Sequence, residues 1–596
     1  MPSSVLADVS AGRATEVDQS LCKHHHMKEG AEMTDQPERH DEATTSPVHG
    51  SSLSRRQFLA GMGAVSGGAL LTATTARLPG VTSLTSRAQP STGASVWAKA
   101  PVSFVFLDTT EPNTLDPSMQ SEFDGMLIMI NTYDALTWTN QLTNTLEPWL
   151  ATSWKASPDG TKWIFQIRNG VKFVDGTPLN AAAVVLSMKR HLAIGAPAQA
   201  GYMLDGIIDV AATGPMEVTF TTKQPQAWLP QHMSMFPIIS AAAIEAHRTA
   251  KDPWAKAWFA DHTAGTGAYA LQEWVRGTKI VLTKNASWWN GPWKPGSIDK
   301  VTVQWESDPG TSAELIESGA ANFATEWSID NALTVGKKRG FTLNRYRADN
   351  TDPMIAFNQA KPPFHIKEVR QAFRYAFDYA AMRNYFRGYS TPTIGVLPPF
   401  SPYALKSLPV FKQDLPKARA LLAQAKIDPS TLTPTCYTAA GYPDLVAGGT
   451  ILQASLAQIG VNIKLQSLPF GSIEAAVTKV STSPPLTSSL YNSIFSPDPT
   501  SFLSSFLPGA FGNEFMNYNS PALVSAYNEA SSSINPADVR AGLDKAQLII
   551  NDDAPVIFGG LPELLIPVPN YLKGYVMQAT YDEYPCLFYL LRVQAH

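Results

Sequence analysis

The chain has 596 residues, with 46 Lys or Arg against 50 Asp or Glu, so its formal net charge is -4 at pH 7. This near balance gives no electrostatic reason to expect a nucleic acid or an anionic membrane as a partner. The length after the N-terminal region allows two or three domains with sizeable cores. Cys436 and Cys586 follow residue 100 and lack zinc-type spacing; either one disulfide or two buried free thiols fits them.

Residues 1–53 are predicted to be a disordered extension. They are polar, rich in histidine and charge and almost free of aromatic side chains, so they cannot build a hydrophobic core. Translation from Met33, or else from Met27, would give the segment that follows an N-terminal region of usual length. We therefore expect that these residues reflect a mis-assigned start.

Residues 54–100 have the features of an export signal and its linker. Arg55 and Arg56 precede a run of small and mildly apolar residues, and the order Ser-Arg-Arg-x-Phe-Leu resembles the twin-arginine signal. The run is too rich in Gly, Ala, Ser and Thr to hold firmly in a bilayer, which favours a cleaved peptide over an anchor. Several small-residue cleavage sites fit. We expect a soluble periplasmic protein after cleavage.

Hydrophobic patterns predict the first elements of the mature chain. Residues 102–107 form an apolar, β-branched and aromatic run, which indicates a strand. Residues 125–136 are apolar on nearly every side and indicate a buried helix. Asn180 is the expected N-cap of a further helix that runs to about His191.

Two turn-linked pairs of strands are also expected. Residues 162–168 alternate apolar and polar side chains, and turns at Asn169-Gly170 and Asp175-Gly176 predict a hairpin with the strand between these turns. Residues 264–271 lead into the second pair, which is expected within residues 274–289.

Later helices are indicated by period and capping. Residues 369–382 are strongly periodic, with one apolar stripe. Asp414 and Pro416 suit the start of a helix that runs to about residue 425. Strands alternate with helices over most of the chain, which predicts an α/β protein with mixed sheets. The stripe comprises Val369, Ala372, Phe373, Ala376, Phe377 and Ala380.

Five segments carry more information together than any one of them carries alone: NTLDP (113–117), the long block 146–190, GTGAYAL (265–271), residues 356–382 and DLPKARALLAQA (414–425). In this order they resemble the extracytoplasmic solute-binding proteins of ABC importers, in family 5, which includes oligopeptide-, dipeptide- and nickel-binding members. The resemblance covers residues 101 to about 590. The Glu-Asp usual in the family's capped helix is replaced here by Ala182-Ala183.

The resemblance implies an α/β fold of the periplasmic binding protein type II kind. Two lobes joined by a hinge close over one solute, and an extra domain is inserted in the first lobe. It implies these boundaries: lobe I, 101–145 and 262–355; the inserted domain, 146–261; lobe II, 356–554; and a return to lobe I, 555–596.

The implied function is capture of a small organic solute and its delivery to the inner-membrane permease subunits of an ABC transporter. Hinge closure needs no covalent chemistry, so we expect neither catalysis nor a cofactor, and we expect a monomer. A secreted hydrolase is the alternative, with Asp108, Glu111 or Asp116 as acid and base. Those carboxylates lie in a turn-rich segment where Asp serves backbone geometry, and the common hydrolase motifs are absent.

The loop around Asp498 bears on the identity of the solute. Peptide-binding relatives hold the α-ammonium of the ligand with an Asp in a loop that reads roughly Asp-Tyr-x-Asp-Pro. Aligning on Asp498-Pro499 places Phe495 at the position of that Asp, and a phenyl ring cannot replace a charge partner. Binding through a free peptide N-terminus is therefore disfavoured, unless a shift in alignment gives Asp498 this role.

Nickel is not favoured by the histidines of the mature chain, which are scattered and never four residues apart: His191, His232, His247, His262, His365 and His596. We expect no metal site. The remaining hypothesis is an uncharged or anionic organic solute, such as a sugar conjugate or a non-classical peptide, held by aromatic faces and amide groups. The candidate ligand contacts are Tyr133, Trp138, Phe357, Asn358, Tyr491, Asn492, Phe495 and Asp498.

Overall fold

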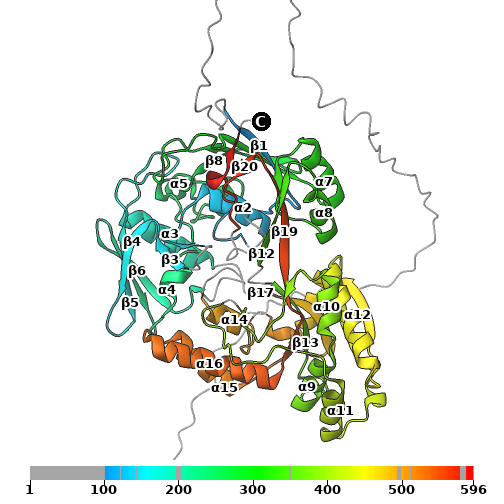
Figure 1. Ribbon diagram of the computed structural model, residues 1–596. Helices are drawn as coiled ribbons and strands as arrows, with labels where there is room; N and C mark the ends of the chain where they lie inside the picture. Colours follow the sequence, from blue (N-terminus) through cyan, green and yellow to red (C-terminus); the bar gives the residue numbers. More distant parts are fainter. Residues whose placement is uncertain are drawn as a thin grey trace, which may run out of the picture. The chain divides into compact units, whose positions relative to one another are not determined.

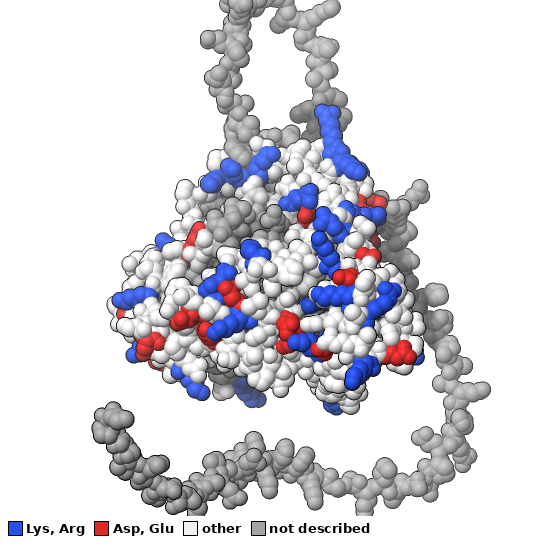
Figure 2. Space-filling view, turned by 60° about the horizontal axis from the view of Figure 1, so that its bottom comes forward, with Lys and Arg blue, Asp and Glu red and all other residues white. Residues whose placement is uncertain are grey.

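The computed structural model describes residues 101–120, 123–140, 145–195, 203–347, 351–399, 401–492, 498–510, 512–577 and 586–594. The predicted export signal with Arg55 and Arg56, and the predicted ligand contact Phe495, lie outside these residues. No helix within the described ranges is both long and apolar enough to cross a membrane. Figure 2 shows basic and acidic side chains interspersed with much uncharged surface on one face of the molecule.

A five-stranded mixed sheet forms the part that we call the N-lobe. Its strand order is β11-β1-β10-β9-β8, with β1 parallel to both of its neighbours. The predicted strand near residue 102 and the predicted pair after residue 264 are confirmed as β1 and as β8 with β9. The strands are β1 (Ser103–Asp108), β8 (Tyr269–Val275), β9 (Lys279–Lys284), β10 (Lys300–Trp305) and β11 (Phe323–Ala324).

The N-lobe has further helices and two small two-stranded sheets, β2-β3 and β20-β21, outside this five-stranded sheet. Helix α2 (Phe123–Thr132) ends at Thr132, earlier than the predicted end at Leu136, because Tyr133 and the residues after it turn into the loop before β2. The remaining elements are β2 (Thr137–Asn140), β3 (Thr145–Pro148), α7 (Pro309–Ser318), α8 (Ile329–Val335), β20 (Leu572–Lys573) and β21 (Arg592–Val593).

A four-stranded antiparallel sheet, order β4-β5-β7-β6, and helices α3 to α6 form the part that we call the insert. The predicted N-cap is confirmed: the Asn180 side chain accepts a hydrogen bond from the Ala183 N–H at the start of α3. The elements are β4 (Ala151–Ala156), β5 (Lys162–Ile167), α3 (Ala181–Ile194), β6 (Ile207–Gly214), β7 (Glu217–Thr222), α4 (Leu229–His232), α5 (Ala241–His247) and α6 (Lys256–Phe259).

The hairpin predicted after residue 162 is wrong. Strand β5 is confirmed, but it pairs with β4 and β7. The segment after it makes one isolated bridge, between Lys172 and Pro178. Val171 and Phe173 are buried in the core of the insert, so this segment packs inward instead of extending the sheet.

A second mixed sheet, order β16-β15-β17-β13-β18, forms the part that we call the C-lobe. The predicted single helix over 369–382 is wrong: α9 (Lys367–Ala376) ends where Phe377 adopts an extended backbone, and a separate helix, α10, begins after the N-cap Asp378. The apolar stripe is confirmed on α9, where Val369, Ala372 and Phe373 are fully buried, but Ala380 on α10 is exposed. Asp414 caps α11 (Leu415–Gln424) as predicted, by accepting the Lys417 N–H. The strands are β13 (Thr351–Phe357), β15 (Thr435–Ala440), β16 (Lys464–Pro469), β17 (Leu486–Asn492) and β18 (Val556–Phe558). The other helices are α10 (Tyr379–Tyr385), α12 (Pro443–Ala457), α13 (Phe470–Val477), α14 (Thr500–Ser504), α15 (Pro521–Ser531) and α16 (Pro536–Asp553).

Two strand connections join the N-lobe to the C-lobe. The chain passes from β12 (Phe341–Arg347) into β13, and it returns from β18 into the long strand β19 (Leu561–Pro569). Strand β12 pairs along its whole length with β19 (Figure 1), and β14 (Ser390–Thr391) pairs with the first two residues of β19. Cys436 lies in the C-lobe core and Cys586 in the N-lobe core. Of the two alternatives for these residues, the structure shows two buried free thiols and no disulfide between them.

Candidate functional site

The candidate site begins where helix α2 ends against two glycines. A Cβ atom on Gly265 would lie 2.3 Å from the Thr132 carbonyl oxygen, and one on Gly267 would lie 2.4 Å from the Thr132 carbonyl carbon. Only residues without a side chain allow this approach. The segment GTGAY therefore places Ala264 and Thr266 directly beside Tyr133 and Asp134.

The Asp134 carboxylate is the centre of the site. It is 8% exposed and accepts three hydrogen bonds: Oδ1 from Trp149 Nε1 at 2.7 Å, and Oδ2 from Trp289 Nε1 at 2.9 Å and from Thr266 Oγ1 at 2.7 Å. Burial raises the pKa of Asp134 above its ordinary value, and the hydrogen bonds from the indoles and the hydroxyl oppose this rise. The carboxylate thus lies among neutral donors.

Tryptophan side chains surround this carboxylate. Trp138 stacks on Trp149 with ring centroids 5.3 Å apart, and Trp149 meets the ring of Trp289 edge-on at 5.1 Å. The Arg168 guanidinium lies 4.6 Å from the centroid of Trp289 and donates from Nε to the Trp149 carbonyl. These contacts fix the planes of the indoles that hold Asp134.

A cavity of about 30 Å³ lies beside Asp134, room for one or two water molecules. The Trp288 indole N–H is buried and lies near the Asp134 carboxylate, whose pKa it helps to lower, although it is not within ordinary hydrogen-bond geometry of any described residue. Tyr133 and Trp138, two of the predicted contacts, both line it, and the Tyr133 hydroxyl accepts the Ala264 N–H at 3.1 Å. The polar and aromatic lining comprises Tyr133, Asp134, Trp138, Trp149, Ser234, Trp288 and Tyr589.

Four other predicted contacts lie in the C-lobe. Phe357 is fully buried and stacks on Phe364 with centroids 5.5 Å apart. The Asn358 side chain, also fully buried, donates to Ser483 Oγ at 2.8 Å and to the Pro484 carbonyl at 3.1 Å. Tyr491 and Asn492 are in β17, opposite residues 352 and 351 of β13. The structure does not bring Phe357 and Asn358 to the cavity beside Asp134. Contact of any of the four residues with solute stays a prediction.

Asp498 joins two parts of the chain that are distant in sequence. Its carboxylate is fully buried, accepts the Thr500 N–H on Oδ1 at 2.7 Å and lies 2.8 Å from His232 Nε2 through Oδ2. His232 is the last residue of α4 in the insert. A role of Asp498 in binding solute stays a prediction, and both carboxylate oxygens already have protein partners.

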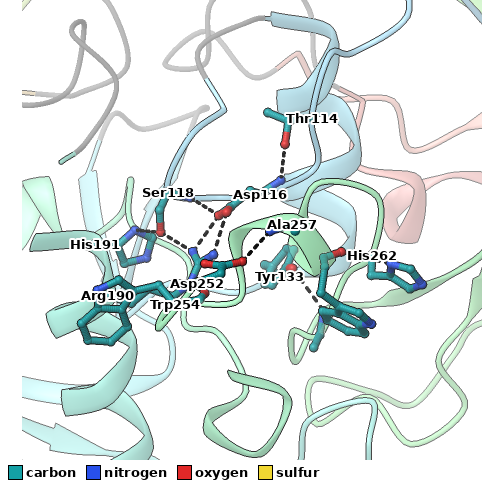
Figure 3. Close-up of polar contacts among 12 residues, drawn as sticks. Thr114, Asp116, Ser118, Tyr133, Arg190, His191, Asp252, Trp254, Ala257 and His262 are labelled. Carbon is teal, nitrogen blue, oxygen red and sulfur yellow. Dashed lines mark hydrogen bonds and ion pairs between the residues drawn. The ribbon is translucent and has the colours of Figure 1, made fainter. Parts of the chain in front are cut away.

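A buried network around Arg190 was missed by the sequence reasoning (Figure 3). The Arg190 guanidinium donates to both oxygens of Asp116 at 2.6 Å and to Ser118 Oγ at 2.7 Å, and all three side chains are buried. Ser118 Oγ lies 2.9 Å from His191 Nδ1. Because His191 Nε2 donates to the Pro237 carbonyl, Nδ1 accepts from the Ser118 hydroxyl.

The Ser118 and His191 pair resembles part of a hydrolase site but differs in its surroundings. The Ser118 oxygen already accepts from Arg190, and Asp116 is held by the same guanidinium instead of by the imidazole. Burial lowers the pKa of His191 to about 4, so this imidazole is neutral at physiological pH. The network fastens the NTLDP segment to α3.

No group of three or more His, Cys, Asp or Glu side chains in the described residues is arranged to hold a metal ion. His247 and His262 instead stack on opposite sides of the Trp258 ring, with centroid distances of 4.1 Å and 4.6 Å. Their imidazoles are therefore separated by an indole.

Comparisons with known proteins agree with the predicted family. Residues 145–514 match the family model of bacterial extracellular solute-binding proteins, family 5 middle. The glutathione-binding protein GsiB of Shigella boydii serotype 4 (strain Sb227) is 30% identical over 335 residues, a match that covers 55% of this chain and 62% of GsiB. The chain thus spans less than two thirds of the curated relatives that it matches.

Solved structures share the fold. The substrate-binding protein CtaP of Listeria monocytogenes superposes with a TM-score of 0.74 at 21% identity, covering 83% of this chain and 100% of CtaP. The periplasmic binding protein DppA of Helicobacter pylori, in complex with the peptide STSA, gives 0.69 at 23% identity, covering 83% and 98%. This likeness confirms the predicted α/β fold of the periplasmic binding protein kind.

Proposed function

The chain belongs to the bacterial extracellular solute-binding proteins of family 5, and from this premise we propose that it captures one small organic solute and delivers it to the membrane permease of an ABC transporter. The observation that carries the proposal is the family match over residues 145–514, in a chain whose two lobes are joined by two strand connections. A solute that touches both lobes stabilises the closed arrangement, which is the whole mechanism.

The protein is proposed to act as a monomer in the periplasm and without catalysis. The absence of a free nucleophile at Ser118, whose oxygen is held by Arg190 in a buried network, supports a binding role over the hydrolase alternative. Export is proposed to depend on the Arg55-Arg56 pair. Replacing both by Lys should leave the precursor in the cytoplasm, and unchanged accumulation of mature protein in the periplasm would contradict this route.

The solute is proposed to be a sugar conjugate or a peptide that is not held by an ordinary N-terminus. The position of Phe495 supports this class, because a phenyl ring offers no charge partner for an α-ammonium. Glutathione is the first candidate to test, since GsiB is named for binding it. Its ammonium shares a carbon with a carboxylate, unlike the free N-terminus of an ordinary peptide.

A thermal-shift screen tests the proposal. The purified chain is heated with glutathione, the peptide Ser-Thr-Ser-Ala, a nickel-histidine complex and a set of oligosaccharides. A solute at a hundredfold excess over its dissociation constant stabilises the folded state by about 2.7 kcal/mol, so a binder raises the melting temperature. Conversion of any panel member into a product, detected by mass spectrometry, would favour the hydrolase instead.

A further inference from the structure

The insert touches the C-lobe through one buried tryptophan. Trp228 precedes helix α4, is 6% exposed and packs in the hydrophobic core of the C-lobe. Its ring meets Tyr403 edge-on with centroids 5.5 Å apart, and its indole N–H donates to the Ala530 carbonyl at 3.3 Å. The neighbouring Ala227 N–H donates to the Ser531 carbonyl at 3.3 Å. A side chain of the insert therefore completes the core of another part of the molecule.

One helical turn later, His232 makes the second contact. His232 Nε2 lies 2.8 Å from Asp498 Oδ2, and the two side chains are 10% and 0% exposed. Residues four apart lie on one face of a helix, so α4 presents Trp228 and His232 together. The Asp498 carboxylate lies close to the hydroxyls of Tyr403 and Tyr527. Burial is the main cause that raises the pKa of each tyrosine, and the negative charge of Asp498 is the second.

This contact is separate from the covalent connections between the lobes. The chain crosses to and from the C-lobe at β12 and β19, near the centre of Figure 1, whereas the start of α4 meets α15 at the lower left. A rotation that opens the lobes about β12 and β19 would pull Trp228 out of its pocket and separate His232 from Asp498. All of these groups belong to the chain itself and need no solute.

We infer that Trp228 with the His232–Asp498 pair forms a closure latch, which keeps the insert against the C-lobe in the absence of solute. The apparent affinity for solute is the affinity of the closed state multiplied by the fraction of molecules that are already closed, so a larger closed fraction gives tighter binding. Loss of the latch lowers that fraction and weakens binding of any solute by the same factor. The latch thus sets the affinity of the protein without contacting the ligand.

Single-molecule energy transfer on the solute-free full chain tests this inference. Ile208 in the insert and Leu548 in α16 are 65% and 51% exposed, so cysteines at these positions accept the two dyes, while Cys22 is replaced by Ser and the native Cys436 and Cys586 are buried. The intact chain should show one main population at the distance of the present structure. Trp228→Ala and His232→Ala should each add an open population, and Trp228→Ala should change the closed-to-open ratio about tenfold or more.

Trp258→Ala is the matched control, because Trp258 stacks between two histidines of the insert. It should leave the distribution unchanged. Two results would overturn the latch: an intact chain that is mainly open without solute, or folded variants with the distribution of the intact chain. If Trp228→Ala fails to fold, His232→Ala carries the test alone. No solute is used, so failure of the solute screen and failure of the latch are distinguishable.

Discussion

Two buried carboxylates, Asp134 and Asp116, differ in what surrounds them. Asp116 is held by both arms of the Arg190 guanidinium in a closed network, whereas Asp134 accepts hydrogen bonds from neutral indoles and a hydroxyl among the described residues and borders a cavity. A charge pair is costly to break, because either partner alone is a buried, uncompensated charge. The comparison indicates that the Asp116 region stabilises the fold, whereas the Asp134 region presents polar groups at an aromatic cavity.

The largest expected effect is on the charge-paired side. Arg190→Met leaves Asp116 buried without its cation and should lower the free energy of unfolding by about 3 to 5 kcal/mol, measured by urea denaturation. The double variant Arg190→Met with Asp116→Leu removes both charges and should recover part of this loss. A loss below about 1 kcal/mol in the single variant would show that the pair is not the anchor of this region.

The pH dependence of the free energy of unfolding gives a second test of the Asp116–Arg190 network, through its neighbour His191. The pKa of His191 is about 4 in the folded chain against 6.5 in the unfolded one, so the unfolded state binds the proton first. The contribution of neutral His191 to the free energy of unfolding is therefore fully present above about pH 6.5. It is lost as the pH falls toward 4, by roughly 3 kcal/mol in total. Urea denaturation of the intact chain and of His191→Gln across this range should show a shallower slope in the variant. Equal slopes would assign the acid sensitivity to other groups.

A milder substitution tests the hydrogen bonds around Asp134. Thr266→Val keeps the shape of the side chain but removes one hydrogen bond to Asp134, which should cost about 1 to 3 kcal/mol in the free energy of unfolding. Thr278→Val, at an exposed turn, is the control and should stay within about 0.5 kcal/mol of the intact chain. A Thr266 variant as stable as its control would mean that the Asp134 cluster is not tightly held.

The last expected effect, of a size similar to that of Thr266→Val, is on solute binding and not on stability. If the loop before Asp498 contacts the solute, Phe495→Asp adds a carboxylate that has no partner in the complex, and binding of the native solute should weaken by about 1 to 3 kcal/mol. The same change should admit peptides with a free α-ammonium. Calorimetry with both ligand types measures this, and tight binding of such peptides by the intact chain would refute the argument from Phe495.

The sequence reasoning succeeded where the signal is local. The stripe on α9 and the caps at Asn180 and Asp414 depend on residues within one or two turns, and each is confirmed. The Asp134 cluster joins residues up to 155 positions apart, and the close approach of Gly265 to Thr132 likewise joins segments that are distant in sequence. Neither period nor capping encodes such contacts. The motif GTGAY marked the place without indicating its partner.

The Arg190 network shows the same limit. The turn-rich segment around Asp116 argues that this carboxylate serves backbone geometry and not acid–base chemistry, but the segment does not reveal its cation, Arg190, which follows 74 positions later on a helix. Only the packing of α3 reveals that the two charges meet. Tyr133 and Trp138 both line the cavity because they lie close to the end of α2 in the sequence.

Native mass spectrometry of the purified chain with glutathione and the other panel solutes tests the central claim most directly, because it reports stoichiometry and chemical identity together. We predict one solute per chain, released on activation with its mass unchanged. Recovery of a cleaved or altered solute would contradict a binding protein, and so would retention of none of the solutes that shift the melting temperature.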